Sequence, residues 1–402
     1  MDIQRGTAMA RKILDLYVKD TEDKGLVVFN VLNDKNEATE ITDFWSMTAL
    51  LAMTVRLSRV NGGNFKSEID RVIEAMEYYK GYRSDNHAGE NGEGRCFNVY
   101  AVPRGKAKNE ADVVGERGEL SVFDDQIWAA IEMVNAYMMH SDEKYLQIAR
   151  ELTEYIYEVG NDPELNGIYW GQAYMSRHAC SNGPFIKLAI MMYEVTGEDK
   201  FLEWAKTIYD FCYNTLRDEK DNLYFDLVRT IYEDPEKDVW HGGKAVANGE
   251  LDEKKYSYNS GTMISGGAYL YAVTGERHYL DEAKATAESC RNYFGSFEIK
   301  DGYVVYPGSD GGTTFSWFNL IMFKGYFDLY KVDNSQGFYL DEVKKVLDFD
   351  YEMYEMDGFI PTTGVVGWTD GRNSFNNRVL MDHVTNADTM MLIGQYCSQK
   401  GF

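Results

Sequence analysis

Residues 196–205 read TGEDKFLEWA, and the same pattern returns as SDEKYLQIA at 141–149 and as TGERHYLDEA at 274–283. Each copy is a short turn that caps and starts a helix, followed by aromatic, leucine and alanine side chains at helical spacing. Each copy also follows a more apolar segment that is rich in small residues. A unit that recurs in this way predicts a fold built from repeated helical hairpins.

Extended along the chain, the repeat predicts twelve helices in six pairs. One helix of each pair is apolar on most sides and is expected inside the fold, whereas its amphipathic partner is expected outside. We predict inner helices at 43–58, 124–139, 182–195, 260–273, 315–330 and 386–398, and outer helices at 3–19, 66–80, 143–158, 199–214, 279–294 and 337–354, with an error of about 2–4 residues at each end. Six pairs indicate an all-α (α/α)6 toroid, in which the N-terminal helix closes the ring against the last inner helix.

The connections between these helices differ in length in a regular way. Those from an inner to an outer helix are short, whereas those from an outer to an inner helix are long: 81–122, 159–181, 215–259, 295–314 and 355–385. All the long connections should therefore meet on the face where the inner helices begin. Loops on a rigid scaffold are where functional residues concentrate. A strand-like patch at 302–306 predicts a small ribbon within one of them.

Composition restricts the partners that the protein can have. The 402 residues include only six prolines and no linker rich in Ser, Gly or Pro, so we expect one domain over residues 1–402. A net charge of −24 argues against nucleic acid, whose phosphates require clustered Lys and Arg, and against anionic membrane surfaces. Aromatic residues make up 14% of the chain, and we expect some of their rings to line a groove.

Metal sites and disulfides are not predicted. The five cysteines are scattered without CxxC spacing, so they form neither a zinc motif nor a compact disulfide framework, and the six histidines have no metal-ligand spacing. The polar N-terminus shows no signal peptide, and no apolar run is long enough to span a membrane. As the sequence stands we expect a cytoplasmic monomer, or a secreted or cell-surface protein if a leader was removed.

Residues 123–128 read FDDQIW and place two adjacent carboxylates where a long loop turns into an apolar helix. Cleavage of a sugar–sugar bond needs two carboxyl groups, one to protonate the departing oxygen and one to meet the cationic sugar carbon. Asp124 and Asp125 are therefore the candidate catalytic pair, and Trp128, one turn later, is a candidate stacking ring. The competing interpretation is an N-cap, because aspartates before a helix commonly satisfy free backbone N–H groups.

The starts of the other predicted inner helices, and one neighbouring loop, are rich in polar and aromatic residues. Amides form paired hydrogen bonds with hydroxyl groups, and aromatic rings cover the apolar face of a sugar. The candidate substrate-binding residues are Trp45, Trp128, Tyr169, Trp170, Asn182, Tyr258, Asn259 and Trp317. For each polar residue among them an N-cap role is again the competing interpretation. His178 lies near the same helix starts, where we expect a structural role.

Taken together, these segments resemble glycoside hydrolase family 76, the endo-α-1,6-mannanases, over nearly the whole chain. FDDQIW is similar to the family's Asp-Asp segment, HACSNG at 178–183 to its Ala-x-Ser-Asn helix start, YSYNSG at 256–261 to its Tyr-Asn-x-Gly helix start, and GIYW at 167–170 to its Gly-Ile/Val-aromatic-Trp loop. The resemblance implies a single catalytic domain that cleaves internal α-1,6-mannosidic bonds of mannan or manno-oligosaccharides with retention, without metal or cofactor. It implies Asp124 as nucleophile and Asp125 as general acid and then base, although the sequence alone does not assign the two roles.

Three other functions fit parts of the sequence. A mannan transglycosylase of the same fold would use the same residues with a sugar acceptor in place of water. Another (α/α)6 sugar enzyme, such as an epimerase or an unsaturated-uronide hydrolase, would need histidine bases or Arg and Lys contacts, which this acidic chain supplies sparingly. A non-catalytic mannan-binding protein would keep the aromatic groove, but the intact aspartate pair argues against it.

Overall fold

The computed structural model describes residues 2–33, 35, 37–84, 96–105, 121–171, 174–237, 239–298, 302–306, 316–360 and 378–401. The long connections predicted at 81–122, 295–314 and 355–385 lie partly outside these residues. The chain divides into two compact units. Unit 1 comprises Met1–Ala75, Tyr256–Ala268 and Leu280–Phe402, and unit 2 comprises Met76–Lys255 and Tyr269–Tyr279.

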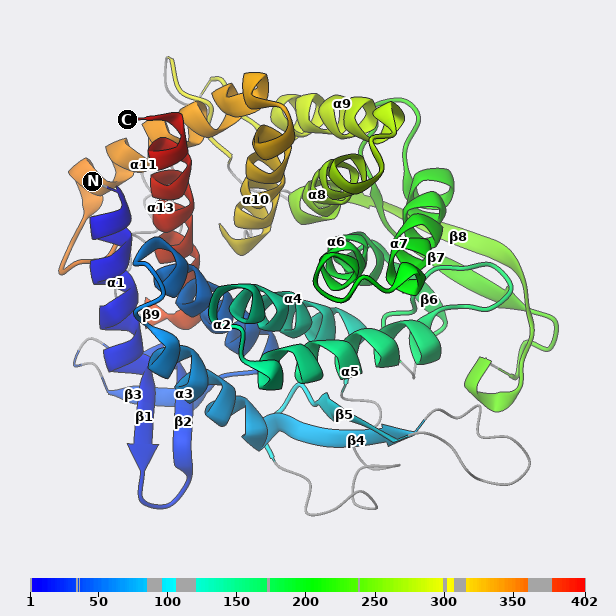
Figure 1. The fold of residues 1–402 in the computed structure, drawn as a ribbon, viewed down its shortest axis with the longest axis horizontal. Helices are drawn as coiled ribbons and strands as arrows, with labels where there is room; N and C mark the ends of the chain where they lie inside the picture. The colour runs from blue at the N-terminus through cyan, green and yellow to red at the C-terminus, as the bar shows by residue number, and fades with distance from the viewer. Residues whose placement is uncertain are drawn as a thin grey trace. The chain divides into compact units, whose positions relative to one another are not determined.

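The described residues contain twelve α-helices, one at each predicted place (Figure 1). The predicted inner helices correspond to α2 (Phe44–Val60), α4 (Phe123–His140), α6 (Ala179–Thr196), α8 (Ser257–Thr274), α10 (Ser316–Val332) and α13 (Leu380–Lys400). The predicted outer helices correspond to α1 (Asp2–Tyr17), α3 (Lys66–Met76), α5 (Glu143–Gly160), α7 (Asp199–Phe211), α9 (Arg277–Phe294) and α11 (Phe338–Tyr354). In unit 1, α1 packs against α13, as predicted for the first outer and the last inner helix.

Helices α6, α8 and α13 each begin at least three residues earlier than predicted, and only α13 does so by more than the expected error. Helix α6 starts at Ala179 instead of residue 182, so that Pro184 lies inside the helix and not in its first turn. Helix α13 starts at Leu380 instead of residue 386, and its added turn buries Leu380, Met381 and Val384. Burial of these side chains stabilises helix beyond the point where sequence periodicity becomes clear.

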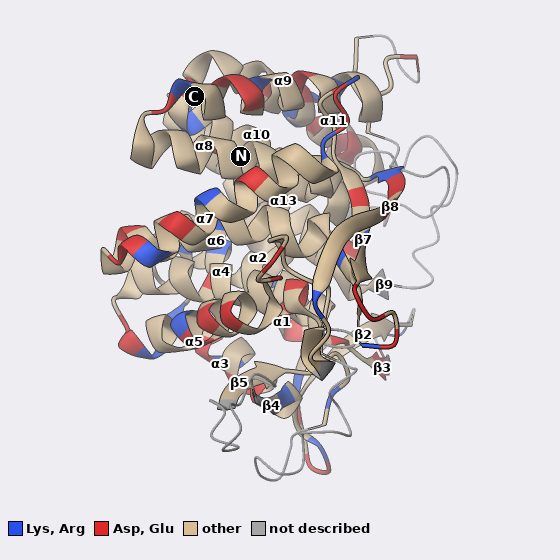
Figure 2. Cartoon of the chain, turned by 90° about the vertical axis from the view of Figure 1, so that its right-hand side faces the viewer, with Lys and Arg blue, Asp and Glu red and all other residues tan. Residues whose placement is uncertain are grey.

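Burial explains why the two kinds of helix differ in sequence. In α13 almost every residue from Leu380 to Gly394 is buried, polar residues such as Asn386 and Asp388 included, so the helix is surrounded by protein on most of its circumference. In α5 the buried apolar residues Tyr145, Ala149, Leu152, Ile156 and Val159 recur three or four positions apart, as expected for a helix with one face in the core. Figure 2 shows charged residues along the same helix. No helix in the described part of the chain has both the length and the apolar character needed to cross a membrane.

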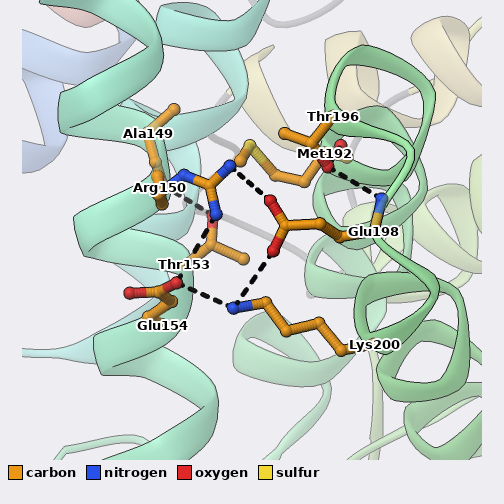
Figure 3. Close-up of polar contacts among 8 residues, drawn as sticks. All are labelled: Ala149, Arg150, Thr153, Glu154, Met192, Thr196, Glu198 and Lys200. Carbon is orange, nitrogen blue, oxygen red and sulfur yellow. Dashed lines mark hydrogen bonds and ion pairs between the residues drawn. The ribbon is translucent and has the colours of Figure 1, made fainter.

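Ion pairs link the recurring turn to the neighbouring helical hairpin, as Figure 3 shows for the copy at 196–205. Glu198 accepts a hydrogen bond from Arg150 of α5 at 2.5 Å and lies 3.5 Å from Lys200. Lys200 also reaches Glu154 at 2.8 Å, which completes a four-residue network. Thr196 caps the turn by accepting from the backbone N–H of Glu198 at 3.2 Å. Because these side chains are partly exposed, the network contributes only modestly to the free energy of unfolding. It links the start of α7 to α5.

The copy at 274–283 repeats this arrangement. Thr274 accepts from the backbone N–H of Glu276 at 3.1 Å, and Glu276 pairs with Lys206 of α7 at 3.1 Å. Gly197 and Gly275 occupy the same left-handed position after α6 and α8, with φ of 71° and 72°. Glycine adopts this conformation without steric cost, which accounts for the Thr-Gly-Glu pattern in the two copies.

Short strands occupy parts of the long connections. In unit 1, β2 (Gly25–Leu32) pairs antiparallel with β1 (Val18–Thr21), β3 (Ala38–Ile41) and β9 (Arg378–Val379). In unit 2, β4 (Lys80–Ser84) pairs with β5 (Cys96–Tyr100), and β7 (Phe225–Tyr232) lies between β6 (Ser176–His178) and β8 (Ala245–Lys255). The predicted patch at 302–306 contributes one bridge, between Ser296 and Val305.

A buried charge cluster joins three helices of unit 1. Asp388 of α13 contacts the Arg56 side chain of α2 and lies 2.8 Å from the Lys324 ammonium of α10. Burial alone would raise the pKa of Asp388, but the two cations outweigh burial and hold that pKa below its ordinary value. Removal of one member of such a cluster leaves charge buried without compensation.

We therefore expect Asp388→Asn to lower the free energy of unfolding by about 3–5 kcal/mol, measured by urea denaturation. The matched control is Asp20→Asn, which removes the same charge from the exposed Arg71–Asp20 pair and should cost less than about 1 kcal/mol. Equal losses in the two variants would show that the cluster does not hold the three helices together.

Candidate active site

Asp124 and Asp125 lie in the first turn of α4, which begins at Phe123. The N-cap is Val122, which has an extended backbone and makes no side-chain capping hydrogen bond. The N-cap interpretation is therefore wrong for this pair, because both aspartates stand on the helix itself. Backbone N–H groups in a first helical turn lack intrahelical partners, and the positive end of the helix dipole favours negative charge there.

Polar groups from the protein surround the Asp124 carboxylate. The backbone N–H of Asp125 donates to Oδ1 at 3.1 Å, and the backbone N–H of Asp124 and the side chains of Trp170 and Cys180 lie close enough to lower the pKa of Asp124. Burial has the largest effect and raises the pKa of Asp124 to about 6, whereas these polar groups act in the opposite direction. Asp124 keeps part of its surface exposed, but Asp125 is only 4% exposed.

Trp170 reaches Asp124 from the loop between α5 and β6, and its backbone is fixed on both sides. Its N–H donates to the Ser176 carbonyl at 3.1 Å, and its carbonyl accepts from the backbone N–H of Phe123 at 2.7 Å. The indole ring stacks on His178, with 5.2 Å between centroids and 17° between planes, and contacts Tyr174. The loop therefore presents the indole N–H in one orientation.

His178 supports this ring without carrying charge near neutral pH. Burial lowers its pKa to about 4, although the Asp252 carboxylate acts to raise it. Its Nε2 lies 2.8 Å from the Ser176 hydroxyl. His178 has the structural role that the sequence predicted.

A side-chain amide holds each of the two long loops that adjoin the aspartate pair. Asn182 of α6 accepts from the backbone N–H of Ile168 at 2.6 Å and donates to the carbonyls of Ile168 and His178 at 2.8 and 2.7 Å. Gln126 of α4 accepts from the backbone N–H of Tyr100 at 2.9 Å and donates to its carbonyl at 2.8 Å. Each amide thus bonds to both the backbone N–H and the backbone carbonyl of one residue, as the backbone of a neighbouring β-strand would.

In unit 1 a related amide binds only the carbonyl of a loop residue. Asn319 of α10 donates to the carbonyl of Tyr306 at 3.0 Å and accepts from the hydroxyl of Ser257 at 2.9 Å. Gln126, Asn182 and Asn319 are each the fourth residue of their helix. Of these three, only Asn182 was predicted to bind substrate, and its amide instead binds one of the protein's own loops.

Two of the predicted substrate-binding residues in unit 2 therefore occupy core positions. Asn182 is fully buried with its amide engaged as described. Tyr169 is also fully buried, where its hydroxyl donates to Asp162 and accepts from the Tyr232 hydroxyl at 2.7 Å. Trp128, one turn after Asp124, is half-buried and remains a candidate for sugar contact.

Predicted rings from three helix starts of unit 1 come together. Trp45 packs edge-on against Trp317 with 5.3 Å between centroids, and Tyr258 lies 6.3 Å from Trp317. Phe318, which the sequence analysis missed, fills the centre, 4.3 Å from Tyr258 and 6.2 Å from Trp45. Trp45 and Tyr258 are half-buried, whereas Trp317 is 4% exposed. Asn259, the remaining predicted contact, is fully buried in α8.

Two polar residues near the aspartates were also missed. Cys180 lies in the quoted segment HACSNG, but a single thiol near a carboxylate has no recognisable spacing in sequence. Asp226 on β7 is close enough to Cys180 to raise the pKa of its thiol, after the larger effect of burial. Within the described residues, no group of three or more His, Cys, Asp or Glu side chains could hold a metal ion.

Comparison with known proteins places the chain among glycoside hydrolases. The model of "Glycosyl hydrolase family 76" matches residues 107–355, more than half of the chain. Mannan endo-1,6-alpha-mannosidase DCW1 of Candida albicans is 27% identical over 141 residues, which are 35% of this chain and 28% of that enzyme. The chain thus matches only about a quarter of the length of this curated relative.

Solved structures extend the similarity to the whole fold. The family 76 glycoside hydrolase (mannosidase) Bt3792 from Bacteroides thetaiotaomicron has a TM-score of 0.78 at 23% identity and covers all of both chains. An inactive variant of the α-1,6-mannanase GH76A of Salegentibacter sp. HEL1_6, in complex with α-1,6-mannotriose, has a TM-score of 0.71 at 19% identity and covers 98% of this chain and 100% of that one. These likenesses confirm the predicted (α/α)6 toroid fold.

The Asn182 amide should be necessary for the loop that carries Trp170. Asn182→Ala leaves the buried N–H and C=O of Ile168 without their partners, so we expect a loss of about 2–3 kcal/mol in unfolding free energy and faster hydrogen exchange in the loop. The control Asn214→Ala removes one exposed side-chain hydrogen bond to Asp210 and should change stability by less than about 0.5 kcal/mol. Unchanged exchange at Ile168 in Asn182→Ala would contradict the role of the amide.

Proposed function

Because the chain belongs to glycosyl hydrolase family 76, we propose that it hydrolyses internal α-1,6-mannosidic bonds of a mannan backbone with retention of configuration. The observation that carries the proposal is the aspartate pair in the first turn of α4, where Asp124 keeps part of its surface exposed. The name of the Candida relative and the oligosaccharide bound to the Salegentibacter relative support the choice of linkage. In that inactive variant two consecutive aspartates are replaced by asparagine, in agreement with a catalytic role for such a pair.

Asp124 is the proposed nucleophile. Backbone N–H groups of the first helical turn favour the charged form of Asp124, which predominates above its pKa of about 6, and part of the surface of Asp124 stays exposed. Its Oδ attacks the anomeric carbon as the bond from that carbon to the glycosidic oxygen breaks. Asp125 gives its proton to the departing oxygen, so that one sugar chain leaves as an alcohol and the other remains as an ester of Asp124.

The second step restores the enzyme. Asp125, now a carboxylate, takes a proton from water, and the resulting hydroxide attacks the same carbon from the face that the first sugar left. The ester bond to Asp124 breaks, and the product keeps the original anomeric configuration after two inversions. Retaining enzymes hold their two carboxyl groups about 5–5.5 Å apart, a separation that neighbouring side chains in one helical turn can reach.

Aromatic rings bind the mannan chain in this proposal. The half-buried ring of Trp128 stacks on a mannosyl unit near Asp124. In unit 1 the partly exposed rings of Trp45 and Tyr258 keep their predicted role as sugar-stacking rings. Trp317 serves to support Trp45. Residues 1–402 act as one catalytic domain.

Asp124→Asn and Asp125→Asn should each lower kcat on linear α-1,6-mannan by about 10²–10⁴-fold or more, because each removes a nucleophile or a proton donor. Reducing-sugar release and product chromatography measure the effect. Asp142→Asn, at the N-cap of α5, is the control and should leave activity and stability unchanged, since asparagine caps as well as aspartate. Near-normal turnover in either catalytic variant would refute the assignment, and products longer than the substrate would indicate transglycosylation.

The pH profile should reflect the pKa of Asp124. Protonated Asp124 cannot attack, so kcat/KM should fall as the pH drops through about 6, the pKa of this group in the free enzyme. Measurement of kcat/KM between about pH 4 and pH 8 locates this acid limb. A limb near pH 4, the ordinary value for aspartate, would show that Asp124 is not the group whose ionisation limits the reaction.

A further inference from the structure

We propose that Arg177 of β6 is a positioning residue, whose guanidinium fixes the loop that carries Trp170 and, through that loop, the start of α4 where Asp124 and Asp125 lie. The inference rests on the proposed function, because it gives Arg177 an indirect part in the same reaction. Arg177 directly precedes the segment HACSNG and lies outside every motif that the sequence analysis singled out.

The Arg177 side chain is fully buried and donates hydrogen bonds to three separate segments of unit 2. Its Nη1 reaches the backbone carbonyl of Asn166 in the loop between α5 and β6 at 2.6 Å. Its Nε reaches the Thr230 hydroxyl on β7 at 3.2 Å, and its Nη2 reaches the side-chain carbonyl of Asn248 on β8 at 2.5 Å. Because the donors of a guanidinium group lie in one rigid plane, Arg177 fixes these three acceptors relative to one another.

The three acceptors are uncharged, although burial of a cation is unfavourable. Burial lowers the pKa of Arg177, and the Asp162 carboxylate of the same loop acts in the opposite direction. Asp162 is itself fully buried, and its carboxylate accepts hydrogen bonds from the Tyr169 hydroxyl and from two backbone N–H groups of its own turn. A buried charge of this kind is weak evidence for a stabilising role. We therefore attribute the presence of Arg177 to the geometry that its guanidinium imposes on the loop.

The loop is held at two places by the strand that carries Arg177. The Arg177 side chain holds Asn166, as described. Further along, Tyr169 forms a β-bridge with Arg177, and the backbone N–H of Trp170 donates to the carbonyl of Ser176 at 3.1 Å. Since only three residues separate Asn166 from Trp170, the backbone of Trp170 has little freedom to move.

Trp170 in turn fixes the first residue of α4. Its carbonyl accepts from the backbone N–H of Phe123 at 2.7 Å, and Phe123 directly precedes Asp124. Backbone N–H groups in a first helical turn have no partner within the helix, so this bond determines where α4 begins relative to the loop. A displacement of about 1 Å in a catalytic group can lower turnover about 10²-fold. The half-buried ring of Trp170 remains a candidate for sugar contact.

Arg177→Lys tests the proposal because it keeps the positive charge and loses the planar set of donors. We expect kcat on linear α-1,6-mannan to fall about 10- to 100-fold, with a smaller change in KM, at a temperature where circular dichroism shows the variant to be folded. Arg291→Lys is the matched control, because it disrupts the two hydrogen bonds from Arg291 to Glu342 between α9 and α11 and should leave kcat unchanged. An unchanged kcat in Arg177→Lys, with or without a raised KM, would overturn the proposal.

Asn248→Ala removes one of the three acceptors at an exposed residue, where little packing is lost. We expect kcat to fall less than in Arg177→Lys, and Asn248→Asp, which keeps an acceptor oxygen, should restore it. Added to Arg177→Lys, the Asn248→Ala change should lower kcat no further, because both act through the same hydrogen bond. Additive losses in the double variant would contradict the shared contact.

Hydrogen exchange without substrate separates this inference from the proposed function. In Arg177→Lys the backbone N–H groups of Phe123 and Trp170 should exchange about tenfold faster, a larger change than for the amides in the middle of α6. Arg291→Lys should not alter their exchange. Unchanged exchange at Phe123 in Arg177→Lys would refute the positioning role whatever the activity. Faster exchange there in a protein that lacks mannanase activity would refute the proposed function and leave the link from Arg177 to α4 in place.

Discussion

The structure depends on a side-chain amide that binds the backbone of a loop from the first turn of an inner helix. Gln126, Asn182 and Asn319 do this at the same helical position, and each pairs with the loop residue Tyr100, Ile168 or Tyr306. A long connection on a helical scaffold loses much conformational entropy when it is ordered. Hydrogen bonds from a buried amide to a buried peptide offset part of that loss and place the loop at a fixed distance from its helix.

This constraint explains how the candidate active site is held. The loop bound by Asn182 carries Trp170, and the helix that carries Asn182 also carries Cys180, so one turn of α6 places both side chains near Asp124. Burial makes the Asp124 carboxylate harder to ionise, while neutral donors and the start of α4 make it easier. The net effect is a pKa of about 6, so the carboxylate form of Asp124 predominates only above that pH.

The helices could be predicted from sequence because each carries its own periodicity, and the three copies of the turn locate the pairs along the chain. The roles of individual polar residues could not be predicted in the same way. Asn182 and Tyr169 lie in segments that resemble the family's motifs, yet both point into the core, and only the path of the loop decides this. Cys180 was not predicted, because a single thiol near a carboxylate has no sequence pattern. The start of α13 was predicted six residues too late, because buried residues extend the helix beyond its periodic segment.

The most direct test of the central claim is to trap the covalent intermediate. An α-1,6-linked mannose oligosaccharide with a fluorine next to the anomeric carbon and an activated leaving group should slow release of the ester, so that fragmentation of the labelled peptide by mass spectrometry identifies the attached residue. We predict a mannosyl adduct on Asp124 that is absent from Asp124→Asn. An adduct on Asp125 or on any other residue would contradict the account.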